Sequence, residues 1–257
     1  MPSTPASWLP FLEQLADQSD AIALAHFRSS GLAAEWKTDR SPVTLADRGI
    51  EDAVRAAVRR RHPELGVLGE EEGESGPGAF RLIVDPIDGT HNFVRGIPIF
   101  ATLLAVERAG EVIAGLVSAP ALGLRWRAAR GAGAWCGERR LGVSPIGTLA
   151  EAQLFHGSIG GTGEGNRLAS LQPLADRVSR TRGFGDFYQH LLVAEGAGEI
   201  AVDPTMKPWD IAALQVIVEE AGGRCTSLRG GRSIYEGSLV STNGRLHDES
   251  LVILTGS

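Results

Sequence analysis

The feature that most constrains this chain is a pair of aspartates, Asp85 and Asp88, placed where an apolar segment ends. Residues 81–85 are predicted to form a short buried strand, which puts Asp85 at the carboxyl end of that strand. Pro86 locks φ and so fixes the direction in which the chain leaves, while Gly89 allows a close approach of the backbone to a ligand. Both carboxylates can face one point, where their repulsion favours a bound cation over a plain acidic turn.

The residues after the strand also suit an anion. If a helix or tight turn begins there, the free N–H groups of Gly89 and Thr90 form a phosphate-binding site. One short segment would then supply oxygen ligands for a cation and amides for a phosphate.

Three further acids stand where either a structural role or a metal-binding role is possible. Glu70 follows an apolar segment, where a solvated acidic loop is the simpler interpretation. Asp210 stands at the predicted start of a helix, where an acid is favourable near the helix dipole. Asp47 lies three residues after Thr44, an arrangement similar to a capping box. Their occurrence in one chain with the aspartate pair favours the metal-binding role.

The spacing of apolar residues predicts a layered α+β fold. Helices are predicted over residues 6–29, from Thr44 onward, and over residues 165–180, 187–194 and 209–220. Strands are predicted over residues 81–85, 99–106, 111–118, 154–158 and 200–202, with a hairpin over 126–135 and loops over 72–78 and 157–165. Hairpins dominate the first half, and strands alternate with helices in the second. We therefore expect two subdomains, residues 1–130 with most of the metal ligands and residues 131–257 with Asp210 and the specificity residues.

Composition argues against several classes of protein. The 257 residues carry a formal net charge of −6, whereas a nucleic-acid-binding protein normally shows a basic stripe. The two cysteines, Cys136 and Cys225, are far apart, which argues against a disulfide scaffold or a thiolate zinc site. No segment approaches the roughly 20 apolar residues of a membrane span, and the first residues lack the pattern of a signal peptide. We expect a cytoplasmic protein with no membrane or nucleic-acid partner.

Four segments together resemble the inositol monophosphatase family. They are Ser41-Pro42-Val43-Thr44 with Asp47, Gly69-Glu70-Glu71, Asp85-Pro86-Ile87-Asp88-Gly89-Thr90 with Asn92-Phe93, and Trp209-Asp210-Ile211-Ala212-Ala213 leading to Glu220-Ala221-Gly222-Gly223. The resemblance covers about residues 35–225, and its third and fourth segments are the most specific. It implies a layered α-β-α-β-α sandwich and a Mg²⁺-dependent phosphatase.

The same resemblance implies a set of metal ligands. They are Glu70, Asp85, Asp88, Asp210 and the carbonyl oxygen of Ile87, with Asp47 reaching a further metal through water. Two or three Mg²⁺ ions are implied, for which Mn²⁺ can substitute, and Mg²⁺ does prefer oxygen ligands. Two such ions can stabilise the attacking and leaving oxygens of a phosphoryl transfer. Since no serine or cysteine with a paired histidine stands out, we expect a metal-activated water as nucleophile, oriented and deprotonated by Glu70 and Thr90.

The evidence on the substrate lies in residues 182–188, which we call the specificity segment. Asp186 stands where members selective for inositol phosphate usually have a small residue, and with Lys207-Pro208 the segment is more similar to the histidinol-phosphate phosphatase branch. Asp203 stands where the family places an acid that contacts the substrate. Two acids suit the ammonium and imidazole of L-histidinol phosphate, whose hydrolysis to L-histidinol and phosphate belongs to histidine biosynthesis. The structural alternative for Asp186 is a helix cap, supported by Gln189.

Two other functions stay open on the sequence. A phosphatase for inositol 1-phosphate or another sugar phosphate would share the metal ligands and differ in the specificity segment. A metal-binding scaffold would keep the fold without catalysis, but it should have lost at least one metal carboxylate, and all are present here. The resemblance further implies a homodimer acting on a small phosphate monoester.

Overall fold

The computed structural model describes residues 4–29, 34–36, 42–160 and 167–256. Ser41 of the first family-like segment, and residues 161–165 of an expected loop, lie outside these ranges. The helices are η1 (Pro5–Trp8), α1 (Leu9–His26), α2 (Leu45–Arg61), α3 (Thr90–Val94), η2 (Leu149–Glu151), α4 (Arg167–Ala175), α5 (Asp186–Ala194), α6 (Pro208–Glu220) and α7 (His247–Thr255). The strands are β1 (Ala34–Trp36), β2 (Pro42–Thr44), β3 (Gly66–Gly69), β4 (Gly73–Ser75), β5 (Phe80–Asp88), β6 (Ala101–Arg108), β7 (Glu111–Ala119), β8 (Leu124–Ala129), β9 (Gly133–Cys136), β10 (Arg139–Arg140), β11 (Gln153–His156), β12 (Arg180–Gly183), β13 (Ile200–Asp203), β14 (Arg224–Thr226) and β15 (Leu239–Thr242).

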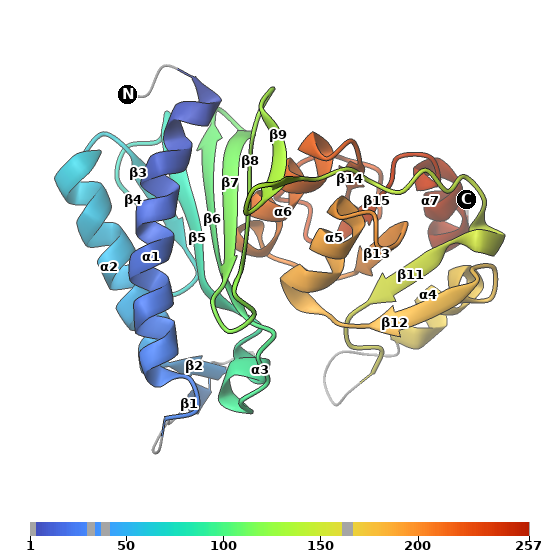
Figure 1. Cartoon of the computed structure of the whole chain (residues 1–257), viewed down its shortest axis with the longest axis horizontal. Helices are drawn as coiled ribbons and strands as arrows, with labels where there is room; N and C mark the ends of the chain where they lie inside the picture. Colours follow the sequence, from blue (N-terminus) through green and yellow to red (C-terminus); the bar gives the residue numbers. More distant parts are fainter. Residues whose placement is uncertain (1–3, 30–33, 37–41, 161–166, 257) are drawn as a thin grey trace.

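These elements form five layers, which follow one another across Figure 1. Helices α1 and α2 cover one face of a large sheet, and α6 packs on the other face with α5 beside it. Helix α5 then contacts a small sheet, whose outer face is covered by α4 and α7. The expected α-β-α-β-α sandwich is confirmed.

The two sheets have different topologies. The large sheet has the order β10-β9-β8-β7-β6-β5-β3-β4, with β3 and β5 parallel and the other neighbours antiparallel. The small sheet has the order β12-β11-β13-β15-β14 and is parallel only around β11. Strands β1 and β2 form a separate antiparallel pair.

Helices on both faces explain the apolar sequence of the central strands. Every residue of β6 except Arg108 is buried, and all of β7 except Glu111 is buried. A strand covered on both faces has no solvent side, so its sequence is a continuous apolar run instead of an alternating one. The turn between them, Ala109-Gly110, has positive φ at both positions, as a two-residue hairpin turn requires.

Gly115 in the middle of β7 sets how closely α6 approaches the large sheet. A Cβ atom there would lie 2.6 Å from Val216 Cγ1 and 3.1 Å from the Cα of Ala213. Only glycine permits this approach without displacing the helix, and the buried Ala213 at the point of contact also has a small side chain. The position of α6 matters for function because Asp210 lies in its first turn.

Several boundaries differ from the sequence-based expectations. The expected division between residues 130 and 131 falls inside the β8–β9 hairpin, whereas the chain passes from one sheet to the other between β10 and β11. The helix expected to reach residue 180 ends at Ala175, and residues 180–183 form β12. The expected loop over 72–78 contains β4, and β14, β15 and α7 were not predicted. Strands β14 and β15, with three and four residues, are too short to give a periodic signal.

No helix in the described part of the chain is long and apolar enough to cross a membrane. Cys136 and Cys225 are both buried and free.

Candidate functional site

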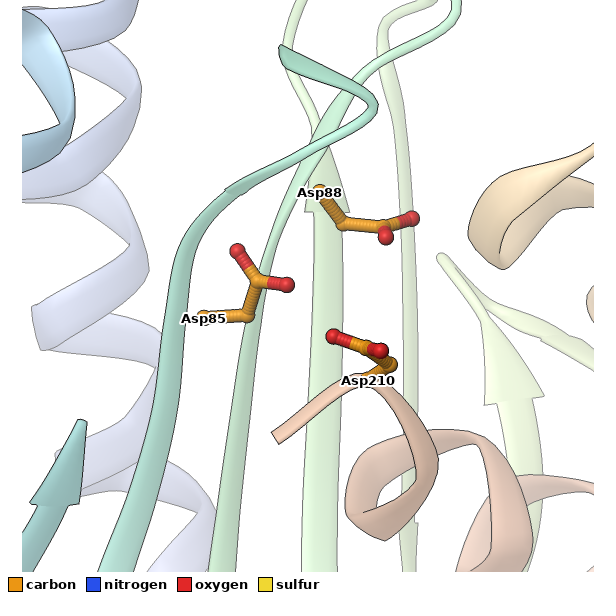
Figure 2. Close-up of side chains that lie close together, drawn as sticks. All are labelled: Asp85, Asp88 and Asp210. Carbon is orange, nitrogen blue, oxygen red and sulfur yellow. The ribbon is translucent and has the colours of Figure 1, made fainter. Parts of the chain in front are cut away.

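Three aspartates from two layers converge at one end of the large sheet. Ligand oxygens of Asp85, Asp88 and Asp210 all lie within 4.8 Å of one another, and we call this group the carboxylate centre. Figure 2 shows the three side chains directed toward a common point, two from β5 and one from α6. Asp85 is buried, and the other two are half-buried.

A β-bulge brings the two aspartates of β5 to the same point. Asp85 pairs with Leu103 and Asp88 with Ala101, so two residues of β5 stand opposite one residue of β6. That opposite residue, Thr102, donates its hydroxyl to the carbonyl of Pro86 at 2.8 Å. A bulge redirects side chains that would otherwise alternate between the faces of the sheet, and the strand expected to end at Asp85 therefore continues to Asp88.

Asp47 serves its helix with one oxygen and leaves the other without a partner. Its Oδ2 accepts from the backbone N–H of Thr44 at 2.8 Å and from the Thr44 hydroxyl at 2.6 Å, so the expected capping box is present. Its Oδ1 and the Oδ1 of Asp85 are both buried without a hydrogen-bond partner. A buried carboxylate oxygen without a donor is costly. This donor set of hard, anionic oxygens fits a divalent cation.

The protein does little to offset these charges. Among the residues that the structure describes, no arginine, lysine or histidine forms an ion pair with Asp47 or with the carboxylate centre. Burial first, and then the charge of Glu70, raises the pKa of Asp85 well above its usual range. Burial and Asp186 raise the pKa of Asp88 in the same direction. Burial also raises the pKa of Asp47 and of Asp210 to about 6.

The turn that follows Glu70 is fixed by a buried ion pair, Glu51 with Arg55, that the sequence did not reveal. The Glu51 carboxylate accepts from the backbone N–H of Glu71 at 2.8 Å and of Glu72 at 3.0 Å, and Arg55 holds Glu51 through its Nε at 2.9 Å. A Cβ at Gly69 would lie 2.2 Å from Glu51, so only glycine fits before Glu70. Glu70 lies outside the group of three within 4.8 Å, but its charge raises the pKa of Asp85 and of Asp210.

The turn after Asp88 has the geometry that the sequence predicted. Gly89 has a φ of 81° and is the N-cap of α3, which begins at Thr90. The Thr90 hydroxyl donates to the carbonyl of Ile87 at 2.8 Å. A Cβ at Gly89 would lie 3.0 Å from the carbonyl of Ile99 and 3.3 Å from Asp186 Oδ2, which explains the need for glycine.

A cavity of about 660 Å³ joins the carboxylate centre to the specificity segment. Asp88 and Asp210 line it together with Asp186 and Asp203. Its other lining residues are His91, Asn92, Gly157, Ser158, Gly183, Phe184, Gly185, Thr205 and Met206. The four acids come from both halves of the chain, so one ligand can contact the carboxylate centre together with Asp186 and Asp203, which we call the specificity acids.

The capping interpretation of Asp186 is wrong. The N-cap of α5 is Gly185, which has no side chain to cap the helix, and Asp186 is the first helical residue. Gln189 donates instead to Asp203 Oδ2 at 2.8 Å. Asp186 accepts from Asn92 Nδ2 at 3.1 Å, a contact between residues 94 apart that the sequence did not predict. The N–H of Phe187 donates to Asp88 Oδ2 at 2.6 Å and joins α5 to the carboxylate centre.

The fold and this site define a class of protein. The model of the inositol monophosphatase family matches residues 5–255, and the chain belongs to that family. The structure is similar to the extragenic suppressor protein suhB of Bartonella henselae, with a TM-score of 0.89 and 30% identity over 96% of this chain and 98% of that one. It is also similar to the IMPase of Thermotoga maritima, with a TM-score of 0.86 and 32% identity over 97% of each chain.

Within this family, the sequence is similar to histidinol-phosphatases. It is 47% identical to the histidinol-phosphatase of Mycobacterium tuberculosis over 246 residues, which cover 93% of this chain and 95% of that protein. It is 43% identical to the histidinol-phosphatase of Streptomyces coelicolor over 246 residues, 92% of each chain. An inositol-1-monophosphatase of Mesorhizobium japonicum is 36% identical over 78% of each chain.

Proposed function

We propose that this protein is a Mg²⁺-dependent phosphatase that hydrolyses L-histidinol phosphate to L-histidinol and phosphate. The observation that carries the proposal is the single cavity lined by both halves of such a site. Asp88 and Asp210 of the carboxylate centre line it together with Asp186 and Asp203. Two relatives that are 43% and 47% identical over 92% and 93% of this chain are histidinol-phosphatases.

The proposed metal ligands are Glu70, Asp85, Asp88, Asp210 and the carbonyl oxygen of Ile87, with Asp47 acting through water. The unpartnered oxygens of Asp47 and Asp85 support this assignment, because each lacks a donor that a cation would replace. When bound, Mg²⁺ would supply a nucleophilic water and would offset the negative charge of the phosphate and of the departing alkoxide. Mn²⁺, which also binds carboxylate oxygens, is expected to substitute.

The chain's own groups would orient the attacking water and accept its proton. Glu70 is the proposed base, because its charge acts on Asp85 and the turn that follows it is fixed by Glu51. The Thr90 hydroxyl donates its hydrogen bond to the carbonyl of Ile87, so the lone pairs of the hydroxyl oxygen can accept a hydrogen bond from the water. The backbone N–H groups of Gly89 and Thr90, at the start of α3, are the proposed donors to the phosphate.

The specificity acids favour a cationic leaving group. Asp186 and Asp203 line the same cavity as Asp88 and Asp210, and L-histidinol carries an ammonium and an imidazole. A charge-assisted hydrogen bond to a carboxylate is stronger than a neutral one. An inositol ring offers only neutral hydroxyls. They could donate hydrogen bonds to these acids but would leave the negative charge of the acids unbalanced.

The test is a comparison of kcat/KM for L-histidinol phosphate and myo-inositol 1-phosphate, with Mg²⁺ and the same enzyme preparation. We expect the first value to be larger by about tenfold or more, as one charge-assisted hydrogen bond would give. The reverse order would contradict the proposed substrate. Turnover of neither ester would favour the non-enzymatic scaffold.

By the same family resemblance we expect a cytoplasmic homodimer, which light scattering on a sizing column and cell fractionation would test.

A further inference from the structure

We propose that Asn92 is a positioning residue for substrate selectivity, because its carboxamide holds the Asp186 carboxylate at the cavity wall without neutralising it. The inference rests on the proposed function, in which Asp186 binds a cationic group of the substrate. Asn92 would not contact the transferred phosphate or take part in proton transfer. It would act through Asp186 alone.

The geometry begins with an amide that makes two hydrogen bonds. The Nδ2 atom of Asn92 donates to the carbonyl of Ile99 at 2.9 Å and to Asp186 Oδ2 at 3.1 Å. A carboxamide nitrogen has two N–H groups. The backbone carbonyl fixes the amide with one of them, and the other is then directed at Asp186. Asn92 and Asp186 both line the cavity, so this contact lies at its wall.

The Asp186 carboxylate has little freedom to find another position. Its backbone has a φ of 50°, in the left-handed region that a residue with a side chain rarely adopts. Its Oδ2 would lie 3.3 Å from a Cβ at Gly89, so the turn after β5 closes one side. As the first residue of α5, Asp186 makes no side-chain cap with its own helix. Asn92 therefore supplies the directional contact that selects one orientation of the carboxylate.

An acid that binds a cationic ligand keeps its negative charge if a neutral donor orients it. Outside the cavity, arginines hold comparable acids, as Arg125 holds Asp20 at 2.6 Å and Arg232 holds Glu219 at 2.7 Å. Those contacts orient the acid and cancel its charge together. Within the described residues, Asp186 has no such ion pair. A carboxamide orients the acid and leaves its charge for a substrate ammonium, which an arginine at the same place would also repel.

The experiment is a double-mutant cycle on Asn92→Ala and Asp186→Asn. For each protein, kcat and KM are measured at saturating Mg²⁺ with L-histidinol phosphate and with glycerol 2-phosphate, an ester without a cation. Asn92→Ala should raise KM for L-histidinol phosphate about three- to tenfold, the value of one net hydrogen bond. Its kcat, and both constants for glycerol 2-phosphate, should change little. In the Asp186→Asn background the Asn92 substitution should add nothing.

A matched control separates this role from loss of a structural hydrogen bond. The Nδ2 of Asn243 also donates twice, to the carbonyl of Ser144 at 3.1 Å and of Ile146 at 2.7 Å, away from the cavity lining. Asn243→Ala should lower Tm and leave the ratio of the two KM values unchanged. If Asn92→Ala does not fold, Asn92→Ser keeps a polar side chain too short to bridge both partners and carries the same expectation.

The outcomes separate the inference from the proposed function. Additive effects in the cycle, or an equal rise of KM for both esters, would overturn the role of Asn92 while the wild-type preference stands. A wild-type enzyme with no preference for L-histidinol phosphate over glycerol 2-phosphate would instead contradict the proposed substrate. A selective and non-additive rise of KM supports both.

Discussion

Two groups of acidic side chains in this protein have opposite surroundings. Around Arg232, the carboxylates of Glu111 and Glu219 each accept hydrogen bonds of 2.7–2.8 Å from one guanidinium, and Arg130 pairs with Glu219 as well. We call these four residues the arginine network. In the carboxylate centre, three aspartates face one another with no basic partner among the described residues. The first arrangement lowers the pKa of Glu111, and the second raises that of Asp85.

The difference indicates what each group is for. The arginine network ties the end of α6 to β7 and to the loop that carries Arg232, so removing one of its members should affect the fold. The carboxylate centre opposes folding when no cation is present, because buried like charges repel and each loses its hydration. Such a group is retained for a ligand and not for stability.

The largest expected effect separates the two groups by activity. Asp210→Asn keeps the size of the side chain and removes its charge, and Glu70→Gln does the same at the proposed base. Both variants should fold, and kcat should fall by about two to four powers of ten, the usual contribution of a general base or a charge-stabilising group. Steady-state kinetics and a melting curve for each variant give the measurement.

The control for this comparison is Glu219→Gln in the arginine network. It should lower Tm and leave kcat close to the wild-type value. An Asp210→Asn protein that melts early but turns over normally would instead give Asp210 a purely structural role, as an acid in the first turn of α6.

A smaller effect is expected at Asp186, the specificity acid held by a neutral donor. Asp186→Asn removes the charge with little change of shape. It should reduce kcat/KM for L-histidinol phosphate by about one to two powers of ten, as expected for a charge-assisted hydrogen bond of ~1.5–3 kcal/mol. Hydrolysis of glycerol 2-phosphate should be almost unaffected. Equal losses with both esters would assign Asp186 to the fold or to the metal site in general.

The smallest effect concerns the stability of the metal-free protein as a function of pH. The pKa of Asp47, Asp186 and Asp210 is raised from 3.8 to about 6 in the folded state, chiefly by burial. Between pH 3.8 and about 6 the folded state binds more protons than the unfolded state. Each group therefore stabilises the fold below pH 4 and loses that contribution as the pH rises through 6. In EDTA, Tm should therefore fall by several degrees between pH 4 and pH 7, given about 2–4 °C per kcal/mol in a chain of this size.

The arginine network provides the contrast to this pH dependence. The pKa of Glu111 is lowered by its hydrogen bond to Arg232, so its contribution is present above the ordinary pKa and is lost in acid. Asp85→Asn should make the metal-free Tm less dependent on pH, and Glu111→Gln should not. A metal-free wild type whose Tm rises steadily from pH 4 to pH 7 would show that the carboxylate centre does not oppose folding.

The parts of the site that lie within one sequence segment were predicted well. The glycine turn, the start of α3 and the Thr44–Asp47 capping box all depend on contacts over a few residues. For Asp47, capping and an open oxygen were treated as competing interpretations, but a carboxylate has two oxygens and the structure uses them differently. The layered fold also followed from local patterns, because two-sided burial leaves continuous apolar strands.

Family resemblance placed Asp210 with Asp85 and Asp88, but two other contacts between distant segments were not predicted. Glu51 accepts from the N–H of Glu71 across 20 residues of chain, and Asn92 donates to Asp186 across 94. Nothing in the neighbouring sequence of either residue indicates its partner, since both contacts depend on how the layers pack. The capping alternative for Asp186 fails for the same reason: the spacing to Gln189 suited a capping box, but Gln189 meets Asp203 on β13 instead.

The most direct test of the central claim is the turnover of L-histidinol phosphate by EDTA-treated protein as Mg²⁺ is added back. The carboxylates of Asp85, Asp88 and Asp210 lack basic partners among the described residues, and we infer that divalent cations provide the missing positive charge. Activity should be absent in metal-free buffer and should return with Mg²⁺, or with Mn²⁺, to the level of the untreated enzyme. Full activity without added metal would contradict the account.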